Sequence, residues 1–209
     1  MEYRERMTAA HSEVDGEDVG APSSACACAC HLTRRDALAF SLLGLVVSGN
    51  TAAVAEPADE RPQVGDWLVA IDAAEPKALA PEDVPPSPML AWPMDPAGNL
   101  VRSGSRLNKI VLVRLEPASL AAVTAGRAAD GVVAYSAICP HAGCEVNAWV
   151  AERHIFECPC HNSRYDPSNA AAIVDGPTTR PLAALPLKTV DGKLAVAGPF
   201  AGRLGIAPT

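Results

Sequence analysis

The chain has few aromatic residues, no excess of positive charge and no apolar stretch of membrane-spanning length. Phe, Trp and Tyr together make up 4% of the 209 residues, so a buried core must consist mainly of Val, Leu, Ile and Ala. The formal net charge of −7 argues against nucleic acid as a partner. The apolar stretch from Ala37 to Val47 has the length of a signal-peptide core and is shorter than the ~20 residues of a spanning helix.

Residues 1–55 differ from the rest and have the features of an export leader. Arg34 and Arg35 precede the apolar stretch, and small residues ending in an A-V-A motif at Ala55 follow it. A basic pair, an apolar stretch and an A-x-A site are the parts of a secretory signal. The twin arginines resemble a Tat signal, which places the protein on the periplasmic side of a bacterial inner membrane. We expect cleavage after Ala55, with an uncleaved membrane anchor over residues 37–55 as the open alternative.

The seven cysteines fall into two groups. Cys26, Cys28 and Cys30 alternate with alanine in the leader, a pattern that could bind a soft metal. They lie on the cytoplasmic side of the signal and would be lost on cleavage, so we expect no metal site there. The other four cysteines belong to the exported part and carry the chemistry: Cys139, Cys144, Cys158 and Cys160.

Residues 56–209 read as one predominantly β domain. Nineteen prolines and fifteen glycines favour many turns and few long helices. One short helix is expected from Glu116 to about Gly126, because Pro117 suits a first turn. Asp72 to Asn108 is a Pro-rich connection with one strand near 89–92, and the sequence does not tell its role. The other expected strands are 64–71, 109–115, 132–138, 154–156 and a hairpin of 185–190 with 194–196.

The candidate metal ligands occur in two pairs. Cys139 and His141 form a Cys-x-His pair, and after sixteen intervening residues Cys158 and His161 form a Cys-x-x-His pair. Two such pairs on loops that cap adjacent strands suit either a tetrahedral metal ion or a small cluster.

One cysteine in each loop is left over. Cys144 follows the first pair, and Cys160 lies inside the second. Two nearby thiols in an exported protein oxidise readily. A Cys144–Cys160 disulfide would then tie the two loops together.

These loops resemble the Rieske iron–sulfur family. Its C-x-H-x-x-C and C-P-C-H motifs stand here as residues 139–144 and 158–161. The resemblance implies an all-β Rieske fold, in which an antiparallel β base carries a small inserted cluster-binding β subdomain over about residues 136–181. It also implies one [2Fe-2S] cluster. By position, two thiolates hold one iron and two imidazoles hold the exposed iron: Cys139 and Cys158, then His141 and His161.

The ligand set has a consequence for the reduction potential. Two neutral imidazoles in place of two thiolates lower the negative charge around the cluster. The potential therefore rises to about −150 to +300 mV, against about −400 mV for plant-type ferredoxins. In high-potential members a Ser and a Tyr hydroxyl donate hydrogen bonds to cluster sulfur, and Ser163 and Tyr165 stand at these positions. We therefore expect a potential in the upper part of the range.

The sequence departs from the family pattern at several positions. Asn162 replaces the usual Gly after the second His, although Asn tolerates positive φ. Ala142 stands where the quinol-oxidising branch has a bulky Leu. Residues 176–181 resemble the proline loop of that branch, whereas residues 72–108 do not resemble it.

We expect an exported electron-transfer subunit that is not catalytic alone. The favoured role is the Rieske subunit of a quinol–cytochrome c oxidoreductase, with a c-type cytochrome as acceptor and a quinol or an oxidase subunit as donor. The first alternative is the small Rieske subunit of a periplasmic molybdenum oxidase such as arsenite oxidase. An alternative of another class is a structural zinc-binding domain. The sequence does not name the donor, the acceptor or the complex.

Overall fold

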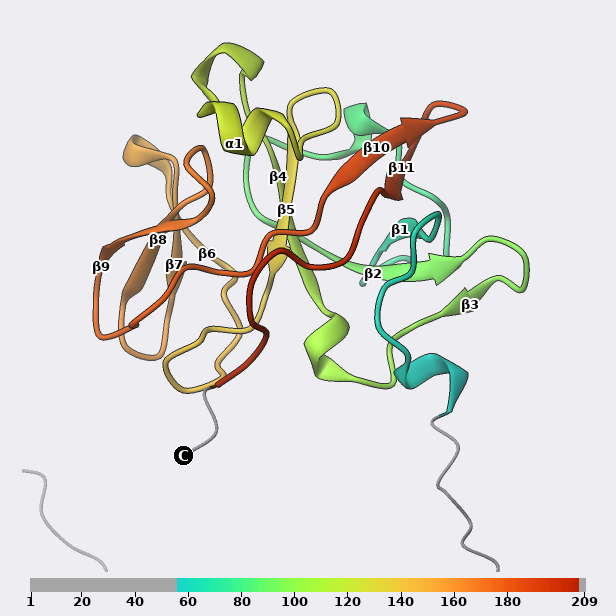
Figure 1. The fold of residues 1–209 in the computed structure, drawn as a ribbon, viewed down its shortest axis with the longest axis horizontal. Coiled ribbons are helices and arrows are strands. Elements are labelled where there is room, and N and C mark those ends of the chain that lie inside the picture. The colour runs from blue at the N-terminus through green and yellow to red at the C-terminus, as the bar shows by residue number, and fades with distance from the viewer. Residues whose placement is uncertain (1–55, 207–209) are drawn as a thin grey trace, which may run out of the picture. The chain divides into compact units, whose positions relative to one another are not determined.

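A computed structural model describes residues 56–206, so the leader, with its arginine pair and its Cys-Ala tract, lies outside the described residues. The described part consists mainly of two antiparallel β-sheets, which confirms the predicted all-β class (Figure 1). Its one α-helix, α1, spans Ala122–Ala125. No helix within residues 56–206 has the length and apolar character needed to cross a membrane.

The larger sheet has seven strands in the order β10-β11-β1-β2-β4-β5, with β3 paired to β2. The smaller sheet has four strands in the order β6-β7-β8-β9. The strands are β1 (Trp67–Ala70), β2 (Met89–Asp95), β3 (Leu100–Val101), β4 (Ile110–Arg114), β5 (Val132–Ser136), β6 (Ala148–Val150), β7 (Ile155–Cys158), β8 (Ser163–Asp166), β9 (Ala172–Asp175), β10 (Leu187–Val190) and β11 (Lys193–Val196). Single 3-10 turns are η1 (Pro57–Asp59), η2 (Pro81–Asp83), η3 (Arg106–Asn108), η4 (Pro117–Ser119) and η5 (Ala151–Arg153).

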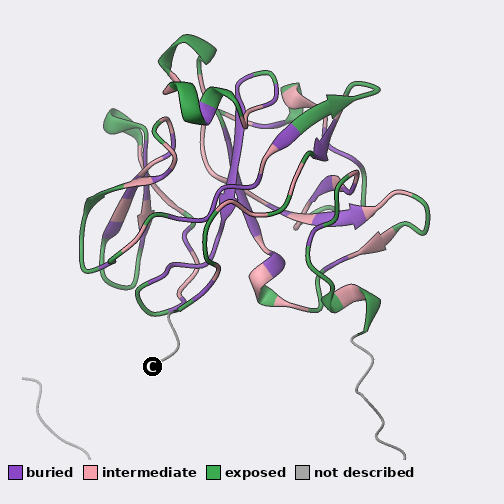
Figure 2. Cartoon of the chain, viewed as in Figure 1, coloured by how far each residue is buried: buried purple, intermediate pink, exposed green. Residues whose placement is uncertain are grey.

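Strands β4 and β5 form a wall between two hydrophobic cores. Side chains alternate along a strand, so Ile110 and Leu112 face the core of the larger sheet. Val111 and Val113 face the core shared with the smaller sheet. Both faces are therefore buried, which explains the continuous apolar runs in the sequence (Figure 2).

The alternation of buried side chains continues from β5 into the first motif. Val133, Tyr135, Ala137 and Cys139 are successive odd-numbered residues, and all four belong to the core shared with the smaller sheet. The ring of Tyr135 meets the ring of Phe156 on β7 edge to face, with centroids 6.2 Å apart. Cys139 therefore lies in the core between the two sheets.

The core is largely aliphatic, as the low aromatic content predicts. Among the described hydrophobic residues that are buried, the aromatic ones are Tyr135, Phe156 and Tyr165. All three lie in the core that contains Cys139 and Cys158. The few buried aromatic side chains of this domain are therefore concentrated around the two motif cysteines.

The structure corrects several expected elements. The expected helix from Glu116 to Gly126 is instead the turn η4 followed by the one-turn helix α1, which Gly126 ends. The segment 72–108 is more than a connection, because β2 lies between β1 and β4 within the larger sheet. Four strands are present that the sequence did not suggest: β3, β6, β8 and β9. The expected strand over 154–156 begins at Ile155, since His154 adopts a left-handed φ of 53° in the preceding turn.

Candidate metal centre

Two loops with the same backbone turn hold the motif residues. In loop 1 (residues 139–144) the N–H of Gly143 donates to the carbonyl of Cys139 at 2.9 Å. In loop 2 (residues 158–162) the N–H of Asn162 donates to the carbonyl of Cys158, also at 2.9 Å. Gly143 and Asn162 both have left-handed φ values, 72° and 54°. The departure from the family's Gly is thus accommodated, because Asn enters this conformation more readily than most residues.

Strand pairing places three site residues and the core residue Phe156 on one face of the smaller sheet. Cys158 on β7 lies opposite Ser163 on β8, and Phe156 lies opposite Tyr165. Directly opposed residues project to the same face, so these four side chains share the buried face. The residues between them, Glu157 and Arg164, project to the other face and form an ion pair at 2.6 Å.

Two free thiols lie at the bottom of the site. Cys139 and Cys158 are each 1% exposed, and neither forms a disulfide. Burial raises the pKa of the Cys158 thiol, backbone amides of loop 2 oppose that shift, and the neighbouring Cys139 adds to it. The buried Cys158 thiol therefore favours its neutral form, so holding it as a thiolate requires a bound cation.

Two histidines lie at the surface end of the same loops. His141 and His161 are exposed, and their ring centroids are 4.8 Å apart with the rings almost perpendicular. One ring comes from each loop. The site therefore offers buried sulfur ligands on one side and exposed nitrogen ligands on the other.

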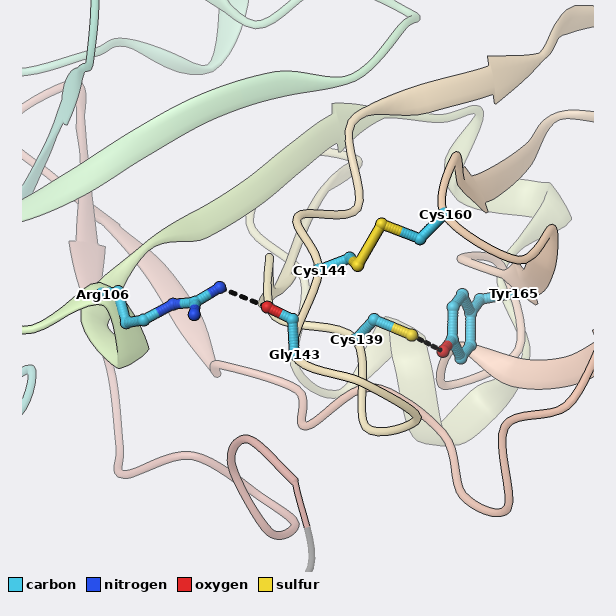
Figure 3. Close-up of a disulfide and its surroundings, with 6 residues drawn as sticks. All are labelled: Arg106, Cys139, Gly143, Cys144, Cys160 and Tyr165. Carbon is cyan, nitrogen blue, oxygen red and sulfur yellow. Dashed lines mark hydrogen bonds between the residues drawn. A yellow bond between two sulfur atoms is a disulfide. The ribbon is translucent and has the colours of Figure 1, made fainter.

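The predicted disulfide between the loops is present. Cys144 and Cys160 are bonded, with Cα atoms 6.5 Å apart (Figure 3). The sulfur atoms of Cys144, Cys158 and Cys160 all lie within 4.8 Å of one another. A disulfide sulfur lacks the charge of a thiolate ligand, so Cys158 is the metal-binding candidate in this group.

Tyr165 contacts one of the two free thiols. Its hydroxyl lies 3.1 Å from the sulfur of Cys139 (Figure 3). Burial raises the pKa of Tyr165, and the contact with Cys139 raises it further. The hydroxyl therefore stays protonated around neutral pH and can donate to a sulfur anion.

Ser163 has a buried hydroxyl without a partner. Within residues 56–206 it is the one buried side-chain polar atom that makes no hydrogen bond. Leaving such a group unpaired costs about 1–3 kcal/mol. It lies opposite Cys158 in the strand pair, so an acceptor bound at the thiols would satisfy it. A cluster with sulfide acceptors fits this arrangement of thiols, imidazoles and hydroxyls.

A third segment, residues 176–181, approaches the junction of loop 2 with β8. A Cβ on Gly176 would lie 2.5 Å from the Cα of Ser163, and its φ is 94°. Only glycine allows this approach. Thr178 is buried and donates to the carbonyl of Arg180 at 3.1 Å. The sequence resemblance pointed to this segment as a whole. It did not point to Thr178, because no motif marks that residue.

The comparisons with known proteins agree with this geometry. The family model described as the Rieske [2Fe-2S] domain matches residues 101–186. The chain carries a Rieske domain. The match includes both loops and the covering segment, and a Rieske domain implies a [2Fe-2S] cluster as its cofactor.

Two curated relatives match parts of this chain. A protein of Haloferax mediterranei named putative respiratory nitrate reductase subunit Rieske is 42% identical over 76 residues, covering 36% of this chain and 34% of that protein. The cytochrome bc1 complex Rieske iron-sulfur subunit of Streptomyces lividans is 34% identical over 100 residues, covering 47% of this chain and 59% of that protein. The matched part is thus well short of the full length of these relatives.

Among solved structures, the ferredoxin of carbazole 1,9a-dioxygenase from Nocardioides aromaticivorans IC177 aligns with a TM-score of 0.39 and 21% identity. That alignment covers 60% of this chain and 98% of the ferredoxin.

The structure places the predicted site residues in one region of the Rieske domain. Loops 1 and 2 hold the candidate ligands and the disulfide, and β8 presents Ser163 and Tyr165 from the strand that follows loop 2. One neighbour was missed: the guanidinium of Arg106 in η3 donates to the carbonyl of Gly143 in loop 1 (Figure 3). No local pattern could have revealed it, since the two residues are 37 positions apart.

Proposed function

We propose that the Rieske domain binds its cluster through four residues: Cys139 and Cys158 on the buried side, His141 and His161 on the exposed side. One observation carries this proposal. Two free, buried thiols lie in the same pair of loops as two adjacent, exposed imidazoles, and a disulfide joins those loops. A bound cluster supplies reversible one-electron transfer.

The surrounding residues control access and potential. The exposed imidazoles form the face at which a partner can exchange electrons, and an imidazole can also exchange a proton through its second nitrogen. Tyr165 and Ser163 donate hydrogen bonds to sulfur on the buried side. These bonds stabilise the added negative charge of the reduced state, and so they favour a high potential.

The domain serves in this proposal as the electron-transfer subunit of a cytochrome bc1-type complex. It accepts electrons from a quinol and passes them to a c-type cytochrome. Support comes from relatives named as bc1 Rieske subunits in Streptomyces lividans and in Mycobacterium tuberculosis, the latter 30% identical over 106 residues.

Export to the periplasmic side of the membrane is part of the same proposal. Arg34 and Arg35 in the leader supply the Tat-type signal. The disulfide in the described part supports an oxidising compartment, because cytosolic thiols are kept reduced.

A second candidate is a Rieske subunit that serves another respiratory enzyme, such as the small subunit of arsenite oxidase. Two observations favour it. Ala142 is exposed beside His141 and offers little apolar surface where the quinol-oxidising branch has Leu. The relative from Haloferax mediterranei carries the name of a nitrate reductase subunit. The zinc alternative has no such support, because the family model that matches is that of a [2Fe-2S] domain.

Ligation is tested with histidine variants of the exported protein. His141→Ala and His161→Cys each remove an imidazole, so each should abolish or grossly change the Rieske EPR signal. His154→Asn is the control, because His154 is exposed in a turn outside both loops and Asn tolerates its left-handed φ. A wild-type signal in either loop variant would refute the assignment, and stoichiometric zinc without iron would favour the structural zinc site.

The role in a complex is tested by purification with bound partners and by stopped-flow mixing. Reduction by a quinol, followed by oxidation by a c-type cytochrome, is the expected result for the bc1-type subunit. Co-purification with a molybdenum enzyme, together with failure of quinol to reduce the protein, would favour the second candidate.

A further inference from the structure

The arginines of this acidic chain differ in how their charge is compensated. Arg102 pairs with Asp66 at 2.7 Å, and Arg164 pairs with Glu157 at 2.6 Å. Arg106 instead donates to the backbone carbonyl of Gly143, and no carboxylate of residues 56–206 forms an ion pair with it. A carbonyl carries no net charge, so the positive charge of Arg106 remains uncompensated.

This charge is held beside loop 1. Gly143 follows His141 by two positions and directly precedes Cys144 of the disulfide (Figure 3). The C-terminal segment packs at the same place. A Cβ on Gly143 would lie 3.8 Å from the side chain of Ile206, and one on Gly205 would lie 3.0 Å from the side chain of Leu107. The turn η3, loop 1 and residues 205–206 therefore lie close together, and the guanidinium of Arg180 donates to the carbonyl of Gly205 in the same region.

We propose that Arg106 is a positioning residue of the metal centre, and that its uncompensated charge raises the reduction potential of the cluster. This inference rests on the proposed ligation by loops 1 and 2. Reduction adds one negative charge to the centre, and a fixed cation nearby stabilises the reduced state more than the oxidised one. Arg106 is exposed, so solvent and salt screen its charge and the effect depends on ionic strength.

A neighbouring ion pair allows the effect of the Arg106 charge to be distinguished from the effect of anchoring loop 1. Lys109, the residue after η3, forms an ion pair at 2.5 Å with Glu145, the residue after loop 1. That pair also anchors the loop, but its two charges cancel. Removing both charges together weakens the anchoring without changing the net charge near the centre. The double variant is therefore a matched control for the loss of Arg106.

The experiment compares four exported, cluster-loaded proteins: wild type, Arg106→Gln, Arg106→Lys and the double variant Lys109→Gln with Glu145→Gln. Iron content and the EPR line shape are measured first. If the wild type itself holds no Rieske cluster, the proposed ligation fails and the role of Arg106 falls with it. If the wild type is loaded, protein-film voltammetry at low and high salt tests Arg106 separately.

The expected result is a lower potential in Arg106→Gln, a potential near wild type in Arg106→Lys, and no shift in the double variant. The difference between Arg106→Gln and wild type should shrink at high salt. Three outcomes would overturn the proposal: an unchanged potential in Arg106→Gln, an equal fall in the double variant, or an equal fall in Arg106→Lys. Loss of the cluster in Arg106→Gln alone would also overturn it, because the charge would then be required for assembly rather than for the potential.

Discussion

Individual hydroxyls at the buried side of the centre differ in what they contact. Tyr165 already reaches the sulfur of Cys139 at 3.1 Å, whereas the hydroxyl of Ser163 has no protein partner. The difference follows from the strand pair. Tyr165 is long enough to cross from β8 to loop 1, and Ser163 lies directly opposite Cys158 with room for a bound acceptor.

Removing either hydroxyl should lower the reduction potential while the cluster stays assembled. Tyr165→Phe and Ser163→Ala each delete a donor to sulfur, and the reduced state loses more stabilisation than the oxidised state. Potentiometric titration followed by EPR checks this. Unchanged potentials would place both hydroxyls away from the cluster.

The left-handed backbone of Asn162 in loop 2 leads to a prediction about stability. Its φ of 54° favours Gly or Asn, and Ala should cost about 1 kcal/mol in the free energy of unfolding. Asn162→Gly should be close to neutral. Urea denaturation measures both, with Asn169→Ala as the control, since Asn169 is exposed and lies outside the left-handed region. Equal costs for the two alanine variants would contradict this account of the loop.

At the scale of elements, the two loops are held in three ways. The disulfide joins them to each other, and Gly176 of the segment 176–181 lies against the end of loop 2. Arg106 of η3 binds loop 1, and Lys109 binds the residue that follows it. The loops cap different strands, β5 and β7, so these contacts between elements set the spacing of the ligands.

Loss of the disulfide should speed up loss of the cluster. Cys144→Ala with Cys160→Ala opens a link between residues 16 positions apart, worth about 3 kcal/mol by the chain-entropy estimate. The variant should assemble some cluster, release iron faster than wild type and show a shifted potential. Thiol alkylation of the denatured, unreduced wild type is the companion measurement, and finding Cys144 and Cys160 both reactive would contradict the disulfide.

The N-terminal segment of the described part is fastened to the larger sheet by a buried ion pair. Arg102, just after β3, donates to Asp66 at 2.7 Å and to Glu60 at 2.8 Å. Arg102→Met should destabilise the fold by about 3 kcal/mol, because Asp66 would remain buried without its partner. The double variant Arg102→Met with Asp66→Leu should recover part of that loss in urea denaturation. A single variant as stable as wild type would show that water compensates Asp66.

For the whole molecule, the β4–β5 wall joins a β base to the sheet that carries the site. The strands β6–β9 lie within residues 148–175, inside the predicted cluster-binding range of 136–181, whose exact bounds stay a prediction. The metal centre lies at the core that the two sheets share, since Cys139 and Cys158 belong to it. Its stability therefore depends on the packing of both sheets.

The last prediction concerns the leader, residues 1–55, and the export of the protein. If the signal is cleaved after Ala55, the mature protein begins at Glu56, directly before η1. Mass spectrometry of the exported protein measures its N-terminus. Recovery of an intact leader in the membrane fraction would show an anchored subunit instead. Replacing Arg34 and Arg35 by lysines should block export by a Tat-type route, which fractionation of the cells would detect.

The sequence by itself determined the candidate ligands, the disulfide and the cofactor class, because all of them lie in two short motifs whose spacing is local. It also predicted β4 and β5, since a strand buried on both faces has a continuous apolar run. The strands β6, β8 and β9 escaped detection, because they have only three or four residues, and β8 and β9 also contain polar side chains. The place of β2 within the larger sheet and the contact of Arg106 with Gly143 were decided only by the tertiary structure. Both depend on pairings between distant parts of the chain, and those pairings form only when the two cores are packed.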